Sequence, residues 1–190
     1  MNSRVFWIAL AFAGLGLTSA SADGIVNGDF EAGNTGFSSE YTSQSECGYG
    51  SYTVGMSSLA FCGDFAVAVG DHTTGTGSML LADGSDVADT VLWSQTVKVT
   101  PGTVYELTFW GTSIDQDSFT TDTPSIQVYV NGKAVGKPLQ LTPHYDGKWR
   151  RGHVAFNSKT ATQANIWLVD LTAEGIGNDY AIDDISLATK

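Results

Sequence analysis

Hydrophobic and polar residues alternate along most of the chain, and long stretches of helical periodicity are nearly absent. Alternation over four to eight residues is typical of β-strands that bury one face. In the segment 104–110, for example, Leu107 and Phe109 share one face, whereas Glu106 and Trp110 share the other. The pattern predicts strands at 24–30, 66–69, 78–81, 91–99, 104–110, 125–130, 135–141, 149–156, 164–171 and 180–187.

Turn signals separate these segments. Pro101-Gly102 has proline and glycine where a type II turn requires them, and Asn131-Gly132 is a strong signal for a two-residue hairpin. Many short strands joined by such turns, without a long helix, are typical of two packed sheets. The sequence therefore predicts an all-β fold, an antiparallel β-sandwich of the jelly-roll type.

The first residues have the composition of a leader. Arg4 precedes an apolar run from Val5 to Leu17, and Ala20-Ser21-Ala22 has the small residues of a cleavage site. We expect a signal peptide at 1–22 and a single β-sandwich domain at 23–190, secreted to the extracellular space or the periplasm. An uncleaved anchor is the alternative, but the run is shorter than the ~20 residues of a membrane span. No membrane association is expected after cleavage.

Charge narrows the range of partners. Residues 23–190 contain 20 acidic and 8 basic residues, because only Arg4 is lost with the leader, and their net charge is −12. Nucleic-acid binding requires clustered Lys and Arg, so no nucleic-acid partner is expected. The surface suits divalent cations and neutral ligands instead.

The only two cysteines are Cys47 and Cys62, 15 residues apart. In an oxidising compartment such a pair is typical of a disulfide that closes one loop. A metal site or a catalytic thiol is the alternative, but no Cys/His cluster surrounds either residue. The sequence therefore predicts a Cys47–Cys62 disulfide.

Acidic residues gather in three distant segments: 27–31, 70–77 and the pair Asp183-Asp184. If the first and last strands are neighbours, Glu31 and Asp183 converge beside the Gly/Thr-rich loop 70–77. Carboxylates and free backbone carbonyls are the ligands that Ca²⁺ prefers. Because side chains alternate along a strand, only one residue of the pair is expected to face a shared ion. The alternative is that each acidic residue serves a turn or caps a helix.

Several segments resemble known modules. NGDFEAGNTGFSSEYT at 27–42, WSQTVKVTPGTVYELTFW at 93–110 and GNDYAIDDISL at 177–187 resemble galactose-binding-like jelly rolls of secreted carbohydrate-binding modules. DHTTGTGSML at 71–80 and AIDDISL at 181–187, together with Phe30-Glu31, also look like MAM adhesion domains, although the further cysteines of MAM domains are missing. The resemblance implies a structural calcium. It assigns the ligands as Glu31, Asp71 and Asp183, with Asp29 and Thr73 as lesser candidates.

A glycan site requires flat aromatic faces and polar groups for hydroxyls. Strand parity predicts one such face, opposite the residues assigned to the core. It consists of Glu106, Trp110, Gln127, Tyr129, Arg151 and Trp167. One alternative is that Trp110 and Trp167 cover a second small core. Another is a site at the loop tips, lined by Tyr41, Tyr49 and Tyr52.

Catalytic motifs are missing from the sequence. It contains no Gly-x-Ser-x-Gly elbow, and the three histidines lack the His-Glu-x-x-His spacing of zinc hydrolases. We therefore expect a non-catalytic, secreted module that binds a polysaccharide or oligosaccharide and holds a structural calcium. The alternatives are an adhesion or matrix module that acts through protein contacts and self-association, and a secreted hydrolase with an unrecognised site.

Overall fold

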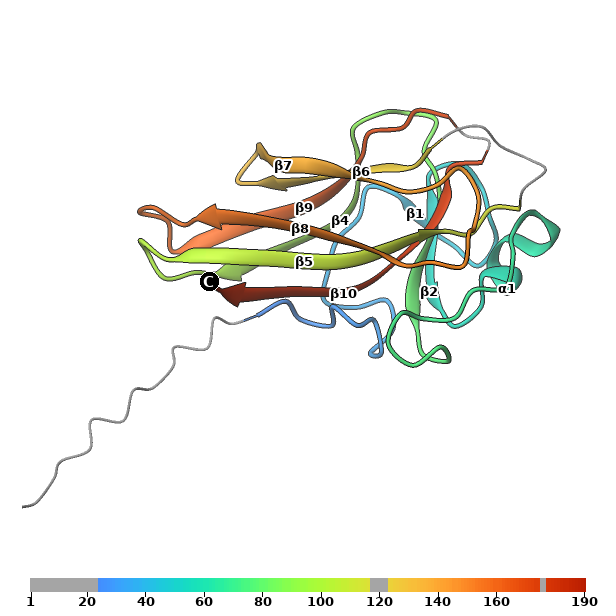
Figure 1. Cartoon of the computed structure of the whole chain (residues 1–190), viewed down its shortest axis with the longest axis horizontal. Helices are drawn as coiled ribbons and strands as arrows, with labels where there is room; N and C mark the ends of the chain where they lie inside the picture. The colour runs from blue at the N-terminus through green and yellow to red at the C-terminus, as the bar shows by residue number, and fades with distance from the viewer. Residues whose placement is uncertain (1–23, 117–122, 175–176) are drawn as a thin grey trace, which may run out of the picture.

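Two β-sheets stacked face to face make up the protein in the computed structural model (Figure 1), which describes residues 24–116, 123–174 and 177–190. One sheet has the order β1-β2-β3-β10-β5-β8 and the other has the order β4-β9-β6-β7. The strands are β1 (Thr42–Ser43), β2 (Ser51–Gly55), β3 (Met79–Asp83), β4 (Thr90–Lys98), β5 (Val104–Ser113), β6 (Ser125–Val130), β7 (Lys133–Gln140), β8 (Arg150–Asn157), β9 (Gln163–Asp170) and β10 (Asp179–Thr189). Within the described ranges only the β1–β2 pairing is parallel. The predicted antiparallel sandwich is confirmed.

The main core lies between the two sheets and consists of the side chains that alternation assigns to it. Leu107 and Phe109 of β5 are at most 1% exposed, and Ile166 and Leu168 of β9 are fully buried. Trp93 of β4 is also fully buried. Burial of such large apolar side chains is the main force that holds the sheets together.

Two of the predicted strands are wrong. Residues 24–30 form turns rather than a strand, because Asn27 and Phe30 have φ angles of 54° and 56°, which no strand tolerates. Residues 66–69 make only an isolated bridge, between Ala66 and Asp115. A short helix, α1 (Ser58–Cys62), and a 3-10 turn, η1 (Gly63–Phe65), precede them, and the Ser57 side chain caps α1 by accepting from the Ala60 N–H.

A second, smaller core covers the outer face of the six-stranded sheet. Met79 and Leu81 of β3 and Ala181 of β10 pack there against Phe61 and Cys62 of α1. The Cys47–Cys62 disulfide is present, with its Cα atoms 4.9 Å apart. The loop that it closes therefore forms a lid over one end of this sheet, on the side where α1 lies in Figure 1.

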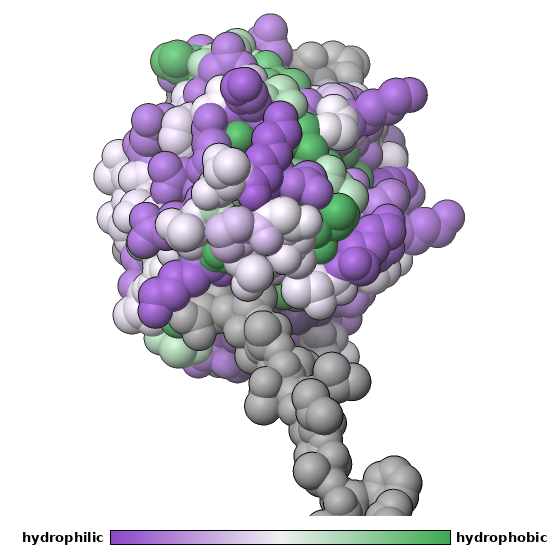
Figure 2. Space-filling view, turned by 90° about the vertical axis from the view of Figure 1, so that its left-hand side faces the viewer, coloured by the Kyte–Doolittle hydropathy of each residue, from purple (hydrophilic) through white to green (hydrophobic). Residues whose placement is uncertain are grey.

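The opposite end of the sandwich is formed by strand ends and tight turns. Figure 2 shows this end covered mainly by hydrophilic and intermediate residues, with smaller hydrophobic patches between them. In the described part of the chain, no helix is long and apolar enough to cross a membrane. The predicted signal peptide at 1–22 lies outside the described residues.

Candidate functional site

The loop 70–77 is organised around the carboxylate of Asp71. Its oxygens accept hydrogen bonds from the N–H groups of Thr74 and Gly77 at 2.9 and 2.6 Å, and from the Thr74 hydroxyl at 2.8 Å. The Thr73 N–H is 3.2 Å away. Burial alone would raise the pKa of Asp71, but these donors outweigh it and lower the pKa to about 2. Asp71 is therefore a carboxylate at neutral pH.

Glu31 meets this loop from the N-terminal segment. Its Oε1 accepts from the Ser78 N–H at 2.8 Å. A Cβ atom at Gly77 would overlap Glu31 Oε1 in its present position and would lie 3.2 Å from the Asp71 carboxylate, so glycine at this position lets the two acids approach this closely. The structure thus brings Glu31 and Asp71 together.

The N-terminal segment itself is fixed by Asn27, because its side chain amide donates to the carbonyls of Gly33 and Thr35 and its oxygen accepts from the Ala32 N–H. Asp29, the lesser candidate, has a 3.4 Å contact with the Glu31 N–H.

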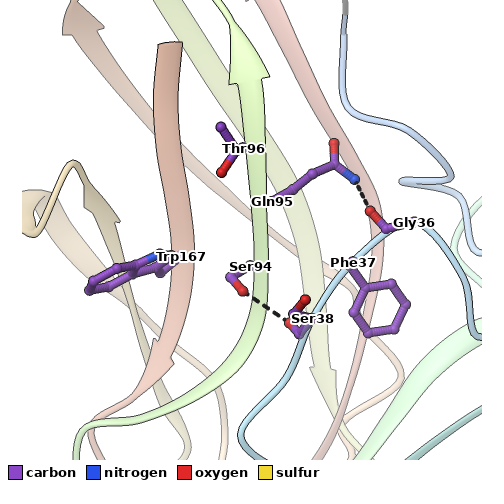
Figure 3. Close-up of a pocket in the computed structure, with 7 residues that line it drawn as sticks. All are labelled: Gly36, Phe37, Ser38, Ser94, Gln95, Thr96 and Trp167. Carbon is purple, nitrogen blue, oxygen red and sulfur yellow. Dashed lines mark hydrogen bonds between the residues drawn. The ribbon is translucent and has the colours of Figure 1, made fainter.

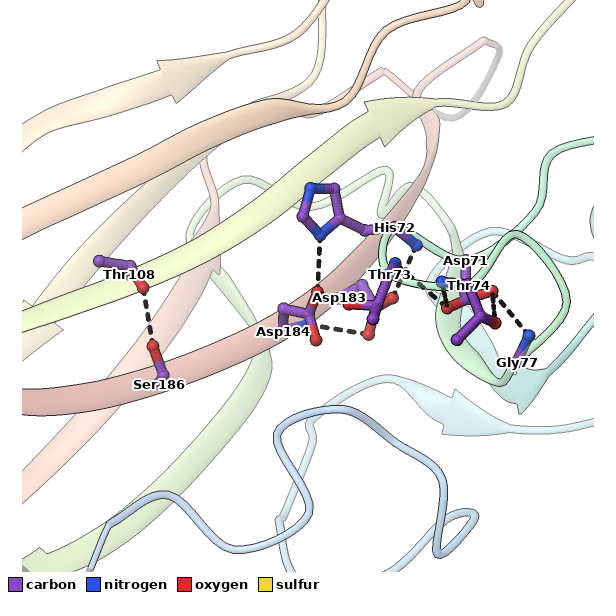
Figure 4. Close-up of polar contacts among 9 residues, drawn as sticks. All are labelled: Asp71, His72, Thr73, Thr74, Gly77, Thr108, Asp183, Asp184 and Ser186. Atoms are coloured by element: carbon purple, nitrogen blue, oxygen red, sulfur yellow. Dashed lines mark hydrogen bonds and ion pairs between the residues drawn. The ribbon is translucent and has the colours of Figure 1, made fainter.

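A bulge in β10 carries the remaining acids (Figure 4). The register against β5 shifts between Asp183 and Ser186, and Asp184 has a φ angle of 49°. Asp183 accepts from the His72 N–H at 2.9 Å, and Asp184 accepts from the Thr73 hydroxyl at 2.5 Å. Both carboxylates of the pair therefore contact the loop 70–77, because the bulge breaks the alternation that would turn them to opposite faces of the strand.

The environment of Asp183 is electrostatically unfavourable for a carboxylate. Only 1% of the residue is exposed. Burial, and then the charges of Asp184 and Asp71, raise the pKa of Asp183 to about 7, although the N–H groups of His72 and Asp184 oppose this. A cation at this position would relieve the repulsion among the three acids.

His72 connects the loop to the predicted aromatic face. Its Nδ1 is 2.6 Å from Asp184 Oδ2, and its ring stacks on Trp110 with the centroids 4.0 Å apart and 17° between the planes. A groove of about 440 Å³ beside Trp110 is lined by Asp29, Thr108 and other residues from the N-terminal segment and β10. Its lining combines acidic and polar side chains with Ile25, Ile185 and one aromatic ring.

Glu106 and Arg151 lie on the same sheet as Trp110. Arg151 pairs with Trp110 across β5 and β8, and its guanidinium is 3.8 Å from the Glu106 carboxylate. Glu106 also lies 3.6 Å from the Lys190 ammonium. Neither side chain is among the residues that line the Trp110 groove, and Arg151 lines another pocket, with Lys137 and His153.

The other predicted aromatic residues lie on the four-stranded sheet. Tyr129 of β6 and Trp167 of β9 are paired across the strands, with ring centroids 6.4 Å apart and 29° between the planes. Trp167 lines a groove of about 490 Å³ with Ser94 and Thr96 of β4, which continues to Phe37 (Figure 3). This second surface combines a pair of aromatic rings with hydroxyl groups.

The six residues of the predicted face therefore do not form one face. Parity along a strand shows which side chains point outward, but it does not show to which sheet the strand belongs. Trp110, Glu106 and Arg151 lie on the six-stranded sheet, and Tyr129 and Trp167 lie on the other. Gln127 is buried, and its amide donates to the carbonyls of Val128 and Val135, so it stabilises the β6–β7 bulge instead of facing a groove.

Comparison of the sequence with protein families and with curated proteins gives no match. The architecture, in contrast, is that of the jelly-roll carbohydrate-binding modules. The xylan-binding domain CBM22-1 of Paenibacillus barcinonensis Xyn10C matches with a TM-score of 0.55 and 15% identity, over 88% of this chain and 95% of that domain. TmCBM61, solved in complex with β-1,4-galactotriose, matches with a TM-score of 0.50 and 18% identity, over 86% and 96%.

The same fold also occurs in an enzyme. The Stig cyclase Fisc from Fischerella sp. TAU matches with a TM-score of 0.58 and 12% identity, over 90% of this chain and 98% of that protein. At these identities the likeness establishes the fold alone, and a fold hosts many activities. The function must therefore be argued from the surfaces described above.

Proposed function

We propose that the protein is a secreted, non-catalytic carbohydrate-binding module that recognises a polysaccharide or oligosaccharide. The observation that carries this proposal is the pair Tyr129 and Trp167 at the groove of about 490 Å³ on the four-stranded sheet. Aromatic rings pack against the C–H faces of sugar rings, and nearby hydroxyls such as those of Ser94 and Thr96 hydrogen-bond to sugar hydroxyls. The shared fold with sugar-binding modules supports this reading.

The groove beside Trp110 is the weaker candidate for glycan binding. One face of its indole is already covered by the His72 ring at 4.0 Å, so less aromatic surface is left for a ligand. The acids around it, Asp29 and Asp184, suit a cation better than they suit a neutral glycan.

We further propose that a structural calcium binds at loop 70–77. Glu31, Asp71 and Asp183 would hold the ion, with Asp29 and Thr73 nearby. The donor set fits, because it consists of hard oxygen ligands and because Gly77 leaves room between two of the acids. Bound calcium would supply positive charge against the mutual repulsion of the acids. The residues of the chain already orient the loop through the hydrogen bonds of Asp71 and Asp183.

A glycan array followed by affinity measurement tests the binding function. Trp167→Ala should weaken glycan binding by about 30-fold, the effect of removing an aromatic hot spot. Trp110→Ala is the matched control, since it removes the same side chain from the other sheet. Equal losses in both variants with lowered stability, or no glycan bound by the parent protein, would contradict the proposal.

Chelation tests the calcium. We expect a chelator to lower the melting temperature of the parent protein by more than it lowers that of Asp183→Ala. An unchanged melting curve would refute the calcium site without affecting the glycan test. Sugar release from a substrate panel would instead indicate a hydrolase, and self-association that is insensitive to added sugar would indicate an adhesion module.

A further inference from the structure

A row of three buried acids crosses the end of the six-stranded sheet beneath the disulfide loop. Asp83 of β3 lies directly opposite Asp179 of β10 in the antiparallel ladder. Asp115, just after β5, accepts from the Asp179 N–H at 3.0 Å. The three residues are 6%, 6% and 2% exposed, in that order. This row is distinct from the acids of loop 70–77.

Oxygen atoms without partners distinguish this row from an ordinary acidic cluster. Asp83 Oδ1 and Asp179 Oδ1 are buried and have no hydrogen-bond partner. The hydroxyl of Ser51, a residue only 2% exposed, also has none. Ser51 lies opposite Asp83 across β2 and β3, and directly paired residues project from the same face of a sheet. Folded proteins rarely leave such groups unpaired, so three buried oxygens on one face indicate a ligand that binds there.

The charges in the row also require compensation. Burial, followed by the charge of Asp179, raises the pKa of Asp83 to about 8. Burial and the charge of Asp115 raise the pKa of Asp179 to about 7. A cation beside these carboxyls would relieve the repulsion of Asp83 by Asp179 and of Asp179 by Asp115.

The donor chemistry determines the class of ion. Two carboxyls and a hydroxyl are hard oxygen ligands, which suit calcium-like ions better than soft metals. Cys47 and Cys62 have sulfur atoms within 4.8 Å of an Asp179 carboxylate oxygen, but the disulfide removes the thiolates that zinc or copper would need.

We propose that Asp83 and Asp179, with the Ser51 hydroxyl beside them, form a second cation site that takes a calcium-class divalent ion. Asp115 adds a third carboxyl group at one side of the site. An ion at this position would link the disulfide loop to the central strands of the sheet. This site goes beyond the calcium proposed for loop 70–77 and does not depend on it.

Calcium stoichiometry tests the proposal. Equilibrium dialysis at pH 7.5 compares the parent protein with Asp83→Asn, Asp179→Asn and, for the other site, Asp183→Asn. Asp83→Asn and Asp179→Asn should each bind one calcium ion fewer than the parent, with unchanged circular dichroism. Unchanged stoichiometry in both variants would overturn the second site. Unchanged stoichiometry in Asp183→Asn would overturn the loop 70–77 site instead, so the two failures are distinguishable.

A second measurement applies even where Asp83→Asn and Asp179→Asn fail to fold. An acid whose folded-state pKa is raised loses stability as the pH rises from about 4 through that pKa. With chelator, the melting temperature of Asp183→Asn should therefore fall between pH 5.5 and pH 8.5, and calcium should restore it at pH 8.5. A fall that calcium does not reverse would mean that protons alone compensate the row, and the proposal would be wrong.

Discussion

The hydroxyl of Tyr41 is at the centre of a buried polar network, and its removal offers a sharp test of the packing between the sheets. Tyr41 Oη donates to Asp170 Oδ2 at 2.8 Å and accepts from the Ser85 N–H at 3.1 Å. Asp170 is fully buried and also accepts from the Asn178 side chain at 2.9 Å. Burial raises the pKa of Asp170, so each hydrogen bond that Asp170 accepts helps to stabilise its ionised form.

Tyr41→Phe should lower the free energy of unfolding by about 3 kcal/mol. The lost hydrogen bond accounts for about 1 kcal/mol and the orphaned Ser85 N–H for a further 1–3 kcal/mol. For a domain of this size, that change lowers the melting temperature by about 6–12 °C. Urea titration followed by intrinsic fluorescence measures it, since the slope with denaturant should stay constant.

Tyr52→Phe is the matched control. The Tyr52 hydroxyl donates to Asn34 at 3.0 Å in a partly buried position and does not leave a buried N–H without an acceptor. We expect its cost to be about 1 kcal/mol. Equal losses for Tyr41→Phe and Tyr52→Phe would show that the reasoning about the orphaned N–H is wrong.

Two further predictions concern the disulfide and a close contact in the core. Replacement of both Cys47 and Cys62 by serine should cost about 3 kcal/mol in the same urea assay, because the unfolded chain regains the freedom of the closed loop. A cost near zero would contradict this estimate. Gly152→Ala should cost about 1–3 kcal/mol, because the added Cβ would overlap the Phe109 ring, which faces it across β5 and β8. Gly55→Ala has nothing within 4 Å and should change stability little, so similar values for the two variants would refute the steric argument.

Strand positions were predictable where local rules act alone. Alternation identified β4 to β10, and the Asn131-Gly132 turn has positive φ angles at both residues, as its hairpin requires. The assignment of strands to sheets was not predictable, because it depends on long-range pairing that leaves no local signal. For that reason Trp110 and Trp167 were expected on one face and lie on two.

The acids of the candidate cation site were predictable only in part. Glu31, Asp71 and Asp183 do meet at loop 70–77, although the first of them arrives on a turn and not on a strand. Asp184 was missed because a β-bulge changes side-chain direction without any sequence mark that precedes it. The role of Gly77 also depends on a contact with Glu31, 46 residues away in the sequence, which no local pattern reveals.

The exposed edges of the two sheets have a consequence for the behaviour of the protein in concentrated solution. β7 is an edge strand and carries Lys133, Lys137 and Pro138, and the edge strand β8 carries Arg150 and Arg151. Half of the basic residues of the segment 23–190 therefore lie on these two strands. A second copy that approached either edge would meet like charges, and on β7 also a residue without an N–H to donate, which protects the protein against strand-by-strand aggregation. We therefore expect other molecules to bind at the sheet faces and the loops and not at these two edges.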